Sequence, residues 1–374
     1  MVYTLDYNID DKKIKYFFAL LIILFILEVY YKNRYEGFAN YKSNCSYLPR
    51  AITNALKKRN INKVYDSSWD YYLPCGYTRC ENDVRGFKNE KTGKKIFMID
   101  GCDWIASKAG LWLLLKKEFD KNAFYIMPET FILNDNKDIK RFKKFYKKKK
   151  EENKDCKFIL KDFRQRQEGL KLANNLKDII NSVDDGYKIV QDFLENPFII
   201  SDRKINFRYY VLISCYQGQI KAWVYKDGFV YYTPKFFIKN SMDFKRTITT
   251  GYIDRKVYQE NPLTVEDFRK YLGPEKAEEW DKEVINKLSL TVRALSKAIC
   301  SEKKLQHHHK FQLFGADIAP DENLKATLME INKGPDIGFK DDRDGNLKKD
   351  MVHDIFAVID PVEEDEKHGY IRIF

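Results

Sequence analysis

Three oxygen-bearing side chains near the end of the sequence have the types and spacing of a metal site. Asp317 lies in the apolar run 311–318, and Glu330 and Asn332 stand two residues apart at the end of the run 326–331. Side chains alternate between the faces of a strand, so Glu330 and Asn332 point to the same face. If Asp317 shares that face, three oxygen donors converge. Such a set suits Mg²⁺, whose shell is completed by water and nucleotide phosphate oxygens.

The element that must position these donors is a β-hairpin. The apolar runs 311–318 and 326–331 are joined by a polar turn at 321–323, which is the pattern of two paired strands. The simpler interpretation is an ordinary hairpin with solvated acids. The apolar residues just before Glu330 weigh against it, because a carboxylate in an apolar setting is costly to bury unless a metal or a partner compensates it.

The hairpin carries a pattern that resembles a known family. Gly315 and Asp317 form a G-x-D strand, and Glu330 and Asn332 form an E-x-N strand. This pair resembles the last motif of the ATP-grasp ligases, in particular that of the tubulin-tyrosine ligase-like family. The resemblance implies an α+β fold of the ATP-grasp type, in which antiparallel-sheet subdomains sandwich ATP, with Asp317, Glu330 and Asn332 as metal ligands.

Upstream motifs follow in the family's order across residues 97–360. Lys108 precedes the segment 128–133, PETFIL, which resembles the family's P-x-T-[FY]-x-L, and Lys161 ends the short apolar strand 158–161. The resemblance implies that both lysines reach the nucleotide phosphates, Lys108 with a catalytic role. An ordered set of motifs is far rarer by chance than one short motif.

A nucleotide pocket is also implied by the resemblance. Residues 187–193, YKIVQDF, match the strand and hinge that hold the adenine in the family. The resemblance therefore assigns Gln191, Asp192 and Phe193 to the lining of that pocket, partly through backbone groups.

The next expected strand, 202–213, presents Lys204 and Arg208 on one face because they stand four residues apart. The resemblance assigns Lys204 to the nucleotide base and Arg208, as a catalytic residue, to the phosphates or the acyl phosphate. Asn206 replaces the family's aspartate and keeps a hydrogen-bond acceptor for the ribose. Thr249 retains a threonine of the family's nucleotide site.

Two positions depart from the family pattern. The loop 162–169 has one glycine where relatives have two or three, although Arg164 and Arg166 could supply phosphate donors instead. Tyr231, which follows the D-G turn of a hairpin expected at 220–232, stands where relatives place an arginine. The missing guanidinium would neutralise charge on the transferred phosphoryl group or bind the substrate.

The reaction implied by the resemblance joins a carboxylate to an amine, with ATP and Mg²⁺ as the expected cofactors. ATP phosphorylates a carboxylate, and an amine displaces the phosphate to give an amide or isopeptide bond. The expected substrates are a free amino acid and an acidic protein, a tubulin tail or similar. The alternative is a catalytically degenerate ATP-grasp protein that serves as a membrane-anchored binder of an acidic partner.

The charge balance favours acidic partners. The chain carries 67 Lys and Arg against 55 Asp and Glu, a formal net charge of +12. The lysine-rich segment 138–157 is expected to be a solvated helix face or mobile loop, and its functional interpretation is a grip on an acidic chain. Nucleic acid would suit the same charge, but no nucleic-acid-binding motif accompanies it, so no nucleic acid is expected.

Composition indicates a globular protein. With 374 residues, 44% of them hydrophobic and 33% charged, the chain is long enough for two or three packed subdomains. The seven cysteines are scattered without a C-x-x-C pair. This pattern predicts reduced thiols.

Residues 16–31, YFFALLIILFILEVYY, predict a transmembrane anchor. As a helix they span roughly 24 Å, and the basic flanks and the tyrosine pair could make up the difference to a hydrocarbon layer of ~30 Å. A cleaved signal peptide and a buried core helix are the alternatives, but no small-x-small cleavage site follows the run. We therefore expect a single-pass membrane protein whose catalytic part faces the cytosol, where ATP is available.

The expected domain organisation follows from these segments. In chain order it comprises a short N-terminal tail 1–15, the transmembrane anchor 16–31, a linker 32–46, an N-terminal subdomain 47–135, a basic charged segment 136–157, central and C-terminal ATP-grasp subdomains 158–360, and a tail 361–374. Helices are expected at 47–59, 262–272, 275–300 and 348–358.

Overall fold

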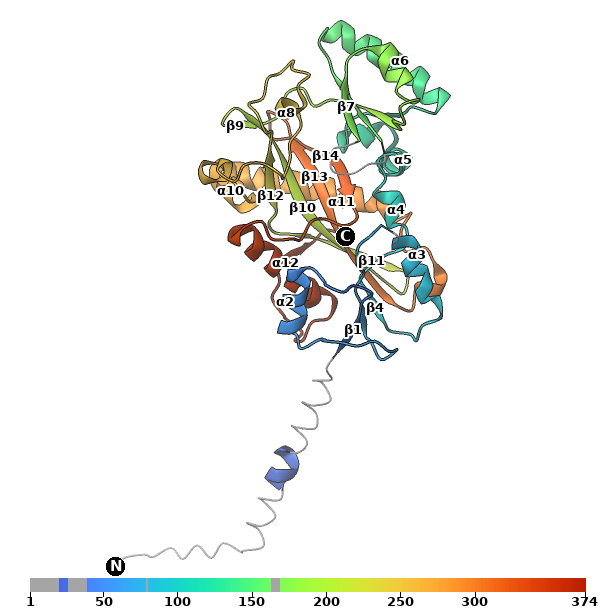
Figure 1. Ribbon diagram of the computed structural model, residues 1–374, viewed down its shortest axis with the longest axis vertical. Coiled ribbons are helices and arrows are strands. Elements are labelled where there is room, and N and C mark those ends of the chain that lie inside the picture. The colour runs from blue at the N-terminus through green and yellow to red at the C-terminus, as the bar shows by residue number, and fades with distance from the viewer. Residues whose placement is uncertain (1–19, 26–38, 79, 163–168) are drawn as a thin grey trace, which may run out of the picture.

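Two long antiparallel strands form the centre of the larger of two β-sheets (Figure 1). The computed structural model describes residues 20–25, 39–78, 80–162 and 169–374. Within them, β10 (Arg203–Tyr216) pairs with β13 (His309–Pro320) along most of its length. Both strands are rich in β-branched and aromatic residues and are almost wholly buried, as expected for strands that are covered on both faces.

Shorter strands extend this sheet on both sides of the central pair, in the order β15-β11-β10-β13-β4-β3-β1-β2, with β9 and β12 paired to β10 and β14 paired to β13. Their bounds are β1 (Asn40–Lys42), β2 (Asn62–Lys63), β3 (Tyr71–Tyr72), β4 (Lys95–Ile96), β9 (Ile199–Ile200), β11 (Gln219–Tyr225), β12 (Phe229–Tyr232), β14 (Ala326–Asn332) and β15 (Tyr370–Arg372). The predicted hairpin near the chain end is confirmed as β13 and β14, which pair antiparallel. Part of the segment predicted as a tail, 361–374, forms the edge strand β15.

The hairpin predicted at 220–232 is wrong. β11 and β12 do not pair with each other; both pair antiparallel with the same edge of β10, one after the other. The residues between them form an irregular step in which Asp227 accepts a hydrogen bond from the backbone N–H of Gly228 at 2.8 Å. A Cβ at Gly228 would lie 2.3 Å from the carbonyl oxygen of Arg208, so the D-G pair serves a close strand approach and not a reversal.

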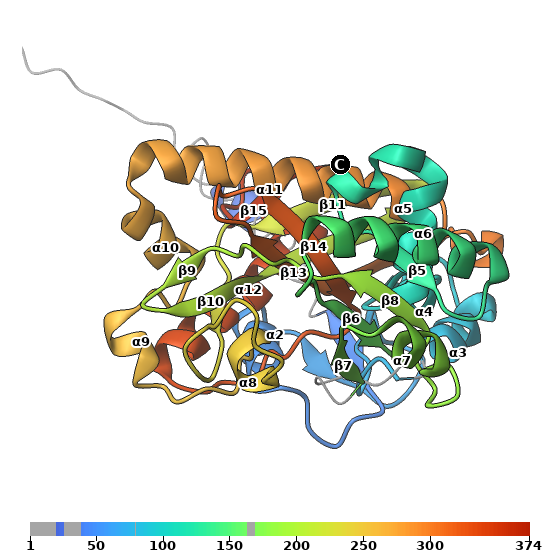
Figure 2. The same cartoon turned by 90° about the horizontal axis from the view of Figure 1, so that it is seen from above.

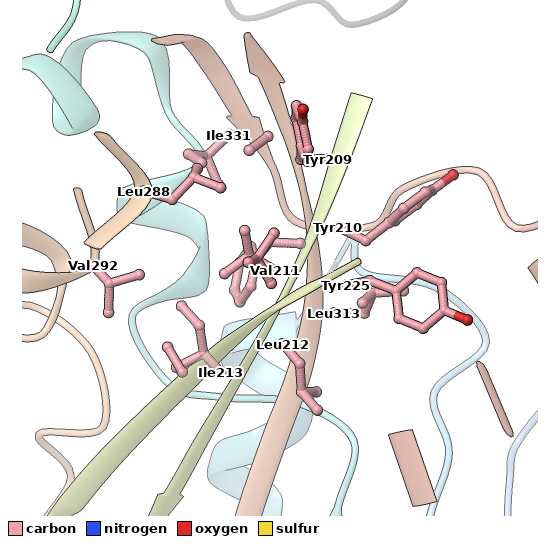
Figure 3. Close-up of a cluster of buried hydrophobic side chains, with 14 of the residues drawn as sticks. Tyr209, Tyr210, Val211, Leu212, Ile213, Tyr225, Leu288, Val292, Leu313 and Ile331 are labelled. Atoms are coloured by element: carbon pink, nitrogen blue, oxygen red, sulfur yellow. The ribbon is translucent and has the colours of Figure 1, made fainter. Parts of the chain in front are cut away.

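Helices cover both faces of the large sheet (Figure 2). α11 (Pro274–Leu295) packs on one face beside α5 (Lys108–Phe119), and α12 (Asp342–Ile359) lies on the other with α2 (Arg50–Lys58). Figure 3 shows Val211 and Ile213 of β10 on the side of Leu288 and Val292 of α11, while Tyr210 points away from them. Because successive side chains of a strand point to opposite faces, β10 contributes to the apolar layers on both faces of the large sheet.

The smaller sheet has four strands in the order β5-β8-β6-β7. These strands are β5 (Thr130–Ile132), β6 (Phe158–Lys161), β7 (Leu170–Ala173) and β8 (Ile189–Asp192), and α6 (Asn136–Glu152) and α7 (Leu176–Asn181) pack on them. The sheet has its own apolar core, separate from that of the large sheet. The arrangement of mixed helices and two sheets is consistent with the predicted α+β class.

α6 holds most of the lysine-rich segment in a regular helix. Its N-cap Asp135 accepts hydrogen bonds from two backbone N–H groups, and Phe142 is fully buried against Phe131 and Phe158, with ring centroids 5.3 and 5.2 Å away. Six lysines of the helix are exposed: Lys137, Lys140, Lys143, Lys144, Lys147 and Lys148. The segment therefore has an aromatic face toward the small sheet and a basic face toward solvent.

The remaining helices are short. They are α3 (Cys80–Arg85), α4 (Cys102–Ile105), α8 (Phe244–Thr247), α9 (Val257–Glu260) and α10 (Val265–Leu272). The helices expected at 47–59, 262–272 and 348–358 correspond to α2, α10 and α12. The helix expected at 275–300 is α11, which ends earlier, at Leu295.

The prediction of reduced thiols is wrong for four cysteines. Cys45 is bonded to Cys75, with Cα atoms 5.0 Å apart, and Cys215 to Cys300, with Cα atoms 6.3 Å apart. The bonded residues are 30 and 85 positions apart in the sequence, so local spacing gave no sign of either disulfide. Cys102 and Cys156 are buried and belong to neither of these two disulfides.

The structure contradicts the predicted membrane localisation with a single-pass anchor at 16–31. In the part of the chain that the structure describes, no helix is both long enough and apolar enough to cross a bilayer. Of the predicted anchor only residues 20–25 are described, as a short helical stretch, and the rest of it lies outside the described residues.

The small sheet should lose stability when its aromatic centre is removed. We expect Phe142→Ala to lower the free energy of unfolding by about 3–5 kcal/mol, because it leaves a cavity among Phe131, Phe158 and Tyr146. Amide hydrogen exchange of β6 and β8 measures the effect. Lys143→Ala, on the exposed face of the same helix, is the matched control and should change stability by no more than about 0.5 kcal/mol. Unchanged protection of β6 in Phe142→Ala would contradict the assigned core.

Candidate active site

A cavity of about 580 Å³ brings together residues of both sheets. Leu170 of β7 lines it from the small sheet and Lys108 from α5. The other lining residues come from β10, β12, β13 and β14 and from the loops 249–252 and 334–340. Seven of the twelve residues proposed from the sequence line this cavity: Lys108, Asn206, Arg208, Thr249, Asp317, Glu330 and Asn332. The other five, which are Lys161, Gln191, Asp192, Phe193 and Lys204, do not line it.

The two carboxylates of the proposed metal site lie directly opposite each other. Asp317 of β13 is the strand partner of Glu330 of β14, and the register shifts just after Asp317. The amide of Asn332 donates a hydrogen bond to Glu330 Oε1 at 3.1 Å. All three residues face the same cavity, so the sequence pattern correctly placed three oxygen donors together. Their role as metal ligands stays a prediction.

Arg208 holds Asp317 from the neighbouring strand. The two residues are partners in the β10–β13 register, and Arg208 donates from Nε to Oδ1 at 2.5 Å and from Nη2 to Oδ2 at 3.2 Å. A Cβ at Gly315 would lie 2.9 Å from Cδ of Arg208, so the glycine of the G-x-D pattern leaves room for this side chain. The two-pronged contact fixes the position of the carboxylate.

Burial and crowding set the charge state of the two acids. Burial raises the pKa of Asp317 to about 6, and the neighbouring Glu330 carboxylate adds to the rise while Arg208 opposes it. Burial also acts to raise the pKa of Glu330, but the ammonium groups of Lys161 and Lys108 outweigh it and hold this pKa below its ordinary value. Two like charges at one point of the sheet are unfavourable. A divalent cation would relieve their repulsion.

Two lysines stand near these acids. Lys108 is the first residue of α5, whose N-cap Ser107 accepts a hydrogen bond from the N–H of Gly110 at 2.9 Å. Lys161 ends β6, is buried, and donates to the carbonyl of Met329 at 3.3 Å. Burial lowers the pKa of Lys161 to about 8, although the Glu330 carboxylate opposes the change. No carboxylate among the described residues forms an ion pair with this buried ammonium. Such a group favours an anionic ligand.

The residues proposed for the base pocket form a second group beside the cavity. The Gln191 amide donates to Thr130 Oγ1 at 2.8 Å, and Asp192 pairs with Lys149 of α6 at 2.9 Å. The ammonium of Lys204 lies 4.6 Å from the ring centroid of Phe193.

The pKa of Lys204, in the proposed base pocket, is strongly lowered. Burial, together with the ammonium groups of Lys157 and Lys161, lowers the pKa of Lys204 to about 7. Because Lys161 acts electrostatically on Lys204, the proposed base pocket lies close to the lysine that is proposed to bind phosphate.

Several buried polar atoms of both groups find no hydrogen-bond partner in the described part of the chain. They are Gln191 Oε1, Asp192 Oδ1 and Asn206 Oδ1. Such atoms are rare in folded proteins and call for a ligand or ordered water. The acceptor that Asn206 was predicted to keep for a ribose is therefore available, whereas Arg164 and Arg166 lie outside the described residues.

A sequence model of the tubulin-tyrosine ligase family matches residues 87–368. The chain belongs to the tubulin-tyrosine ligase family. This family is of the ATP-grasp type, so the resemblance stated from the motifs is confirmed.

Individual relatives are similar over parts of their length. The probable tubulin polyglutamylase TTLL9 of Bos taurus is 31% identical over 182 residues, 46% of this chain and 38% of that protein. The probable tubulin polyglutamylase TTLL2 of Mus musculus is 25% identical over 266 residues, 66% of this chain and 46% of that protein. Tubulin glycylase 3B of Drosophila melanogaster is 25% identical over 197 residues, 48% and 26% respectively. The chain thus matches less than half the length of each of these curated relatives.

Some of the residues that line the cavity were not identified from the sequence. Tyr252, Asp336 and Lys340 line the cavity, but no motif marks them. Tyr231 was noted only as the position of a missing arginine, yet its ring lies 5.6 Å from the guanidinium carbon of Arg208. Spacing within one strand could not have shown these neighbours, because they come from three separate loops and strands.

Groups of three or more His, Cys, Asp or Glu side chains that could hold a metal are absent from the residues that the structure describes. The proposed site has two carboxylates and one amide, so it depends on phosphate and water oxygens to complete a Mg²⁺ shell. Metal and nucleotide are therefore expected to bind together.

The lowered lysine pKa values predict proton uptake when a nucleotide binds. At pH 8 the buried Lys204, with a pKa of about 7, is mostly neutral, and Lys161, at about 8, is half charged. A bound triphosphate favours the charged forms, so about one proton should enter per ATP. Calorimetry in two buffers of different ionisation enthalpy measures this number.

Lys204→Met should remove most of the uptake, whereas Lys177→Met, at an exposed site on α7, should leave it unchanged. Equal uptake in the native chain and in Lys204→Met would contradict the assignment.

Proposed function

We propose that this member of the tubulin-tyrosine ligase family is an ATP-dependent carboxylate–amine ligase that adds an amino acid to a protein carboxylate through an acyl phosphate. The observation that carries the proposal is the convergence of Asp317, Glu330, Asn332 and Arg208 on one cavity, which Lys108 also lines. Family membership and relatives named as tubulin polyglutamylases support the reaction class.

The chemistry of the donor set fits Mg²⁺. Asp317 and Glu330 supply carboxylate oxygens and Asn332 an amide oxygen, which are hard ligands. When bound, Mg²⁺ offsets the negative charge of the phosphates during phosphoryl transfer. Each carboxylate oxygen of Asp317 accepts from Arg208 and still has a lone pair for a metal.

The cationic residues orient the triphosphate in this proposal. Lys161 of β6 and Lys108 of α5 both act on the Glu330 carboxylate and would hold phosphate oxygens, while Arg208 of β10 would face the transferred group. Gln191, Asp192, Phe193 and Lys204 would hold the base. Positioning and charge stabilisation account for most catalysis of phosphoryl transfer, so such an arrangement suits the reaction.

The proposed acceptor is an acidic protein chain such as a glutamate-rich tubulin tail. The formal net charge of +12 and the exposed lysine face of α6 favour such a partner. Lys149 of the same helix, which is not one of these exposed lysines, pairs with Asp192, so α6 contacts the proposed base pocket. The donor is a free amino acid, whose identity depends on the shape of the cavity.

A second candidate function is a degenerate ATP-grasp protein that binds an acidic partner without ligating it. The specific observation in its favour is Tyr231, which replaces the guanidinium that relatives use. Against it, both carboxylates and Asn332 remain together in the cavity at the cost of burying like charges. That cost is hard to explain in a site that binds no metal.

The decisive variant is Glu330→Gln, which removes one negative charge and keeps the shape of the side chain. We expect ligation of a labelled amino acid to an acidic acceptor peptide to fall at least about a hundredfold, because a lost metal ligand removes several kcal/mol of charge stabilisation. Turnover with excess Mg²⁺ and ATP is the measurement. Glu322→Gln, in the exposed turn after β13, is the matched control and should retain activity.

Two outcomes would count against the proposal. Intact ligation by Glu330→Gln would refute the metal assignment. Tight binding of an acidic peptide by the native chain, with no ATP consumption under any donor amino acid, would favour the degenerate protein instead.

A further inference from the structure

A lysine that no motif marks stands next to the position of the missing arginine. Lys340, between β14 and α12, lines the cavity with Tyr231. Its ammonium nitrogen lies 6.0 Å from the ring centroid of Tyr231 and 4.8 Å from that of Tyr252, and it donates to the carbonyl of Gly251 at 2.9 Å. The cavity therefore keeps a cation beside Tyr231, delivered from a different segment of the chain.

The segment before Tyr252 is shaped around this lysine. A Cβ at Gly251 would lie 3.2 Å from Nζ of Lys340 and 3.1 Å from the ring of Tyr231, which is closer than side chains normally approach. Glycine at this position lets the backbone carbonyl reach the ammonium while the tyrosine ring stays beside it. The site of Lys340 is thus a packed arrangement and not a loose surface contact.

The charge of Lys340 is not neutralised by an ion pair with any carboxylate of the described residues, since none lies within 4.0 Å of its nitrogen. Arg208 differs, because Asp317 binds it with two contacts. Asp344, the acid on the adjoining helix turn, is held by Lys348 at 3.0 Å. Lys340 therefore has N–H groups for an anion that enters the cavity.

The place of Lys340 separates it from the proposed phosphate side. Lys340 lines the cavity, whereas Lys161 does not line it and donates to the carbonyl of Met329. The ring of Tyr231 has the guanidinium carbon of Arg208 at 5.6 Å and the ammonium nitrogen of Lys340 at 6.0 Å from its centroid, so both cations border the same tyrosine.

We propose that Lys340 binds the α-carboxylate of the donated amino acid and replaces the guanidinium that Tyr231 displaces. This inference rests on the proposed ligase function and adds the residue that recognises its free substrate. An α-amino acid that is held by its carboxylate at Lys340 presents its amine toward Arg208 and the acyl phosphate. A cation and a carboxylate form a strong, charge-assisted hydrogen bond in such a half-buried site.

The test compares Lys340→Met with Lys340→Arg in the full chain. Glycine, L-glutamate and L-tyrosine are titrated in the presence of Mg²⁺ and a non-hydrolysable ATP analogue, and each is paired with its α-carboxamide. We expect the native chain to prefer at least one amino acid over its amide by about tenfold or more, and Lys340→Met to lose this preference. Lys340→Arg should restore it, and affinity for the ATP analogue should stay within about twofold in both variants.

A second variant tests the replacement itself. Tyr231→Arg introduced into Lys340→Met should recover amino-acid binding, because it returns a guanidinium to the same part of the cavity. Lys349→Met, on α12 and outside the cavity lining, is the control for loss of a lysine and should bind like the native chain. Thermal unfolding of each variant establishes that it is folded.

The outcomes separate this inference from the ligase proposal. Amino-acid binding that depends on Lys340 without any ligation would support the inference and refute the ligase. Ligation with an unchanged KM for the amino acid in Lys340→Met would overturn the inference alone. A tenfold loss of affinity for the ATP analogue in Lys340→Met would assign the lysine to phosphate instead, and absence of binding by all three amino acids to the native chain would also overturn it.

Discussion

The structure of the candidate site depends on two carboxylates placed opposite each other across one strand pair. Asp317 and Glu330 are partners in the β13–β14 register, in a buried part of the molecule where like charges repel. Arg208, from the third adjacent strand, offsets part of this charge and fixes the position of Asp317. The central strands of the large sheet therefore serve both as core and as scaffold, because β10 packs Val211 and Ile213 toward α11 and also aligns Arg208 with Asp317 of β13.

Buried positive charge beside the cavity balances these acids only in part. Lys161 and Lys204 are buried with lowered pKa values, of about 8 and 7, so charging them disfavours the ligand-free fold. Because their pKa is lower in the folded than in the unfolded chain, this penalty is absent above pH 10.5 and reaches its full size below pH 7. For Lys204 it is on the order of a few kcal/mol. A protein keeps such a penalty where a bound anion removes it, and a metal–nucleotide brings both a cation for the acids and phosphates for the lysines.

How much of this followed from the sequence depends on how local each signal was. The hairpin of β13 and β14 and the long helix α11 follow from short periodic patterns, and the spacing of Glu330 and Asn332 on one strand places them on one face. The residues Asp227 and Gly228 have the sequence of a β-turn, but they form no hairpin because Gly228 lies against the neighbouring strand β10. The disulfide of Cys45 with Cys75 and the approach of Lys340 to Tyr231 join segments that are far apart in the chain, for which spacing gives no signal. The apolar run at 16–31 shows the reverse case, in which a strong local pattern was given a role that no described helix supports.

The central claim is that Asp317, Glu330 and Asn332 hold a metal against a triphosphate that upstream lysines bind. A crystal structure of the full chain with Mn²⁺ and a non-hydrolysable ATP analogue, with the metal located by its anomalous signal, tests it most directly. The account predicts a Mn²⁺ ion at about 2.1–2.3 Å from carboxylate oxygens of Asp317 and Glu330, with phosphate oxygens in the same shell and Lys161 within hydrogen-bonding distance of the triphosphate. A nucleotide bound with its metal elsewhere, and with Asp317 contacting Arg208 alone, would contradict it.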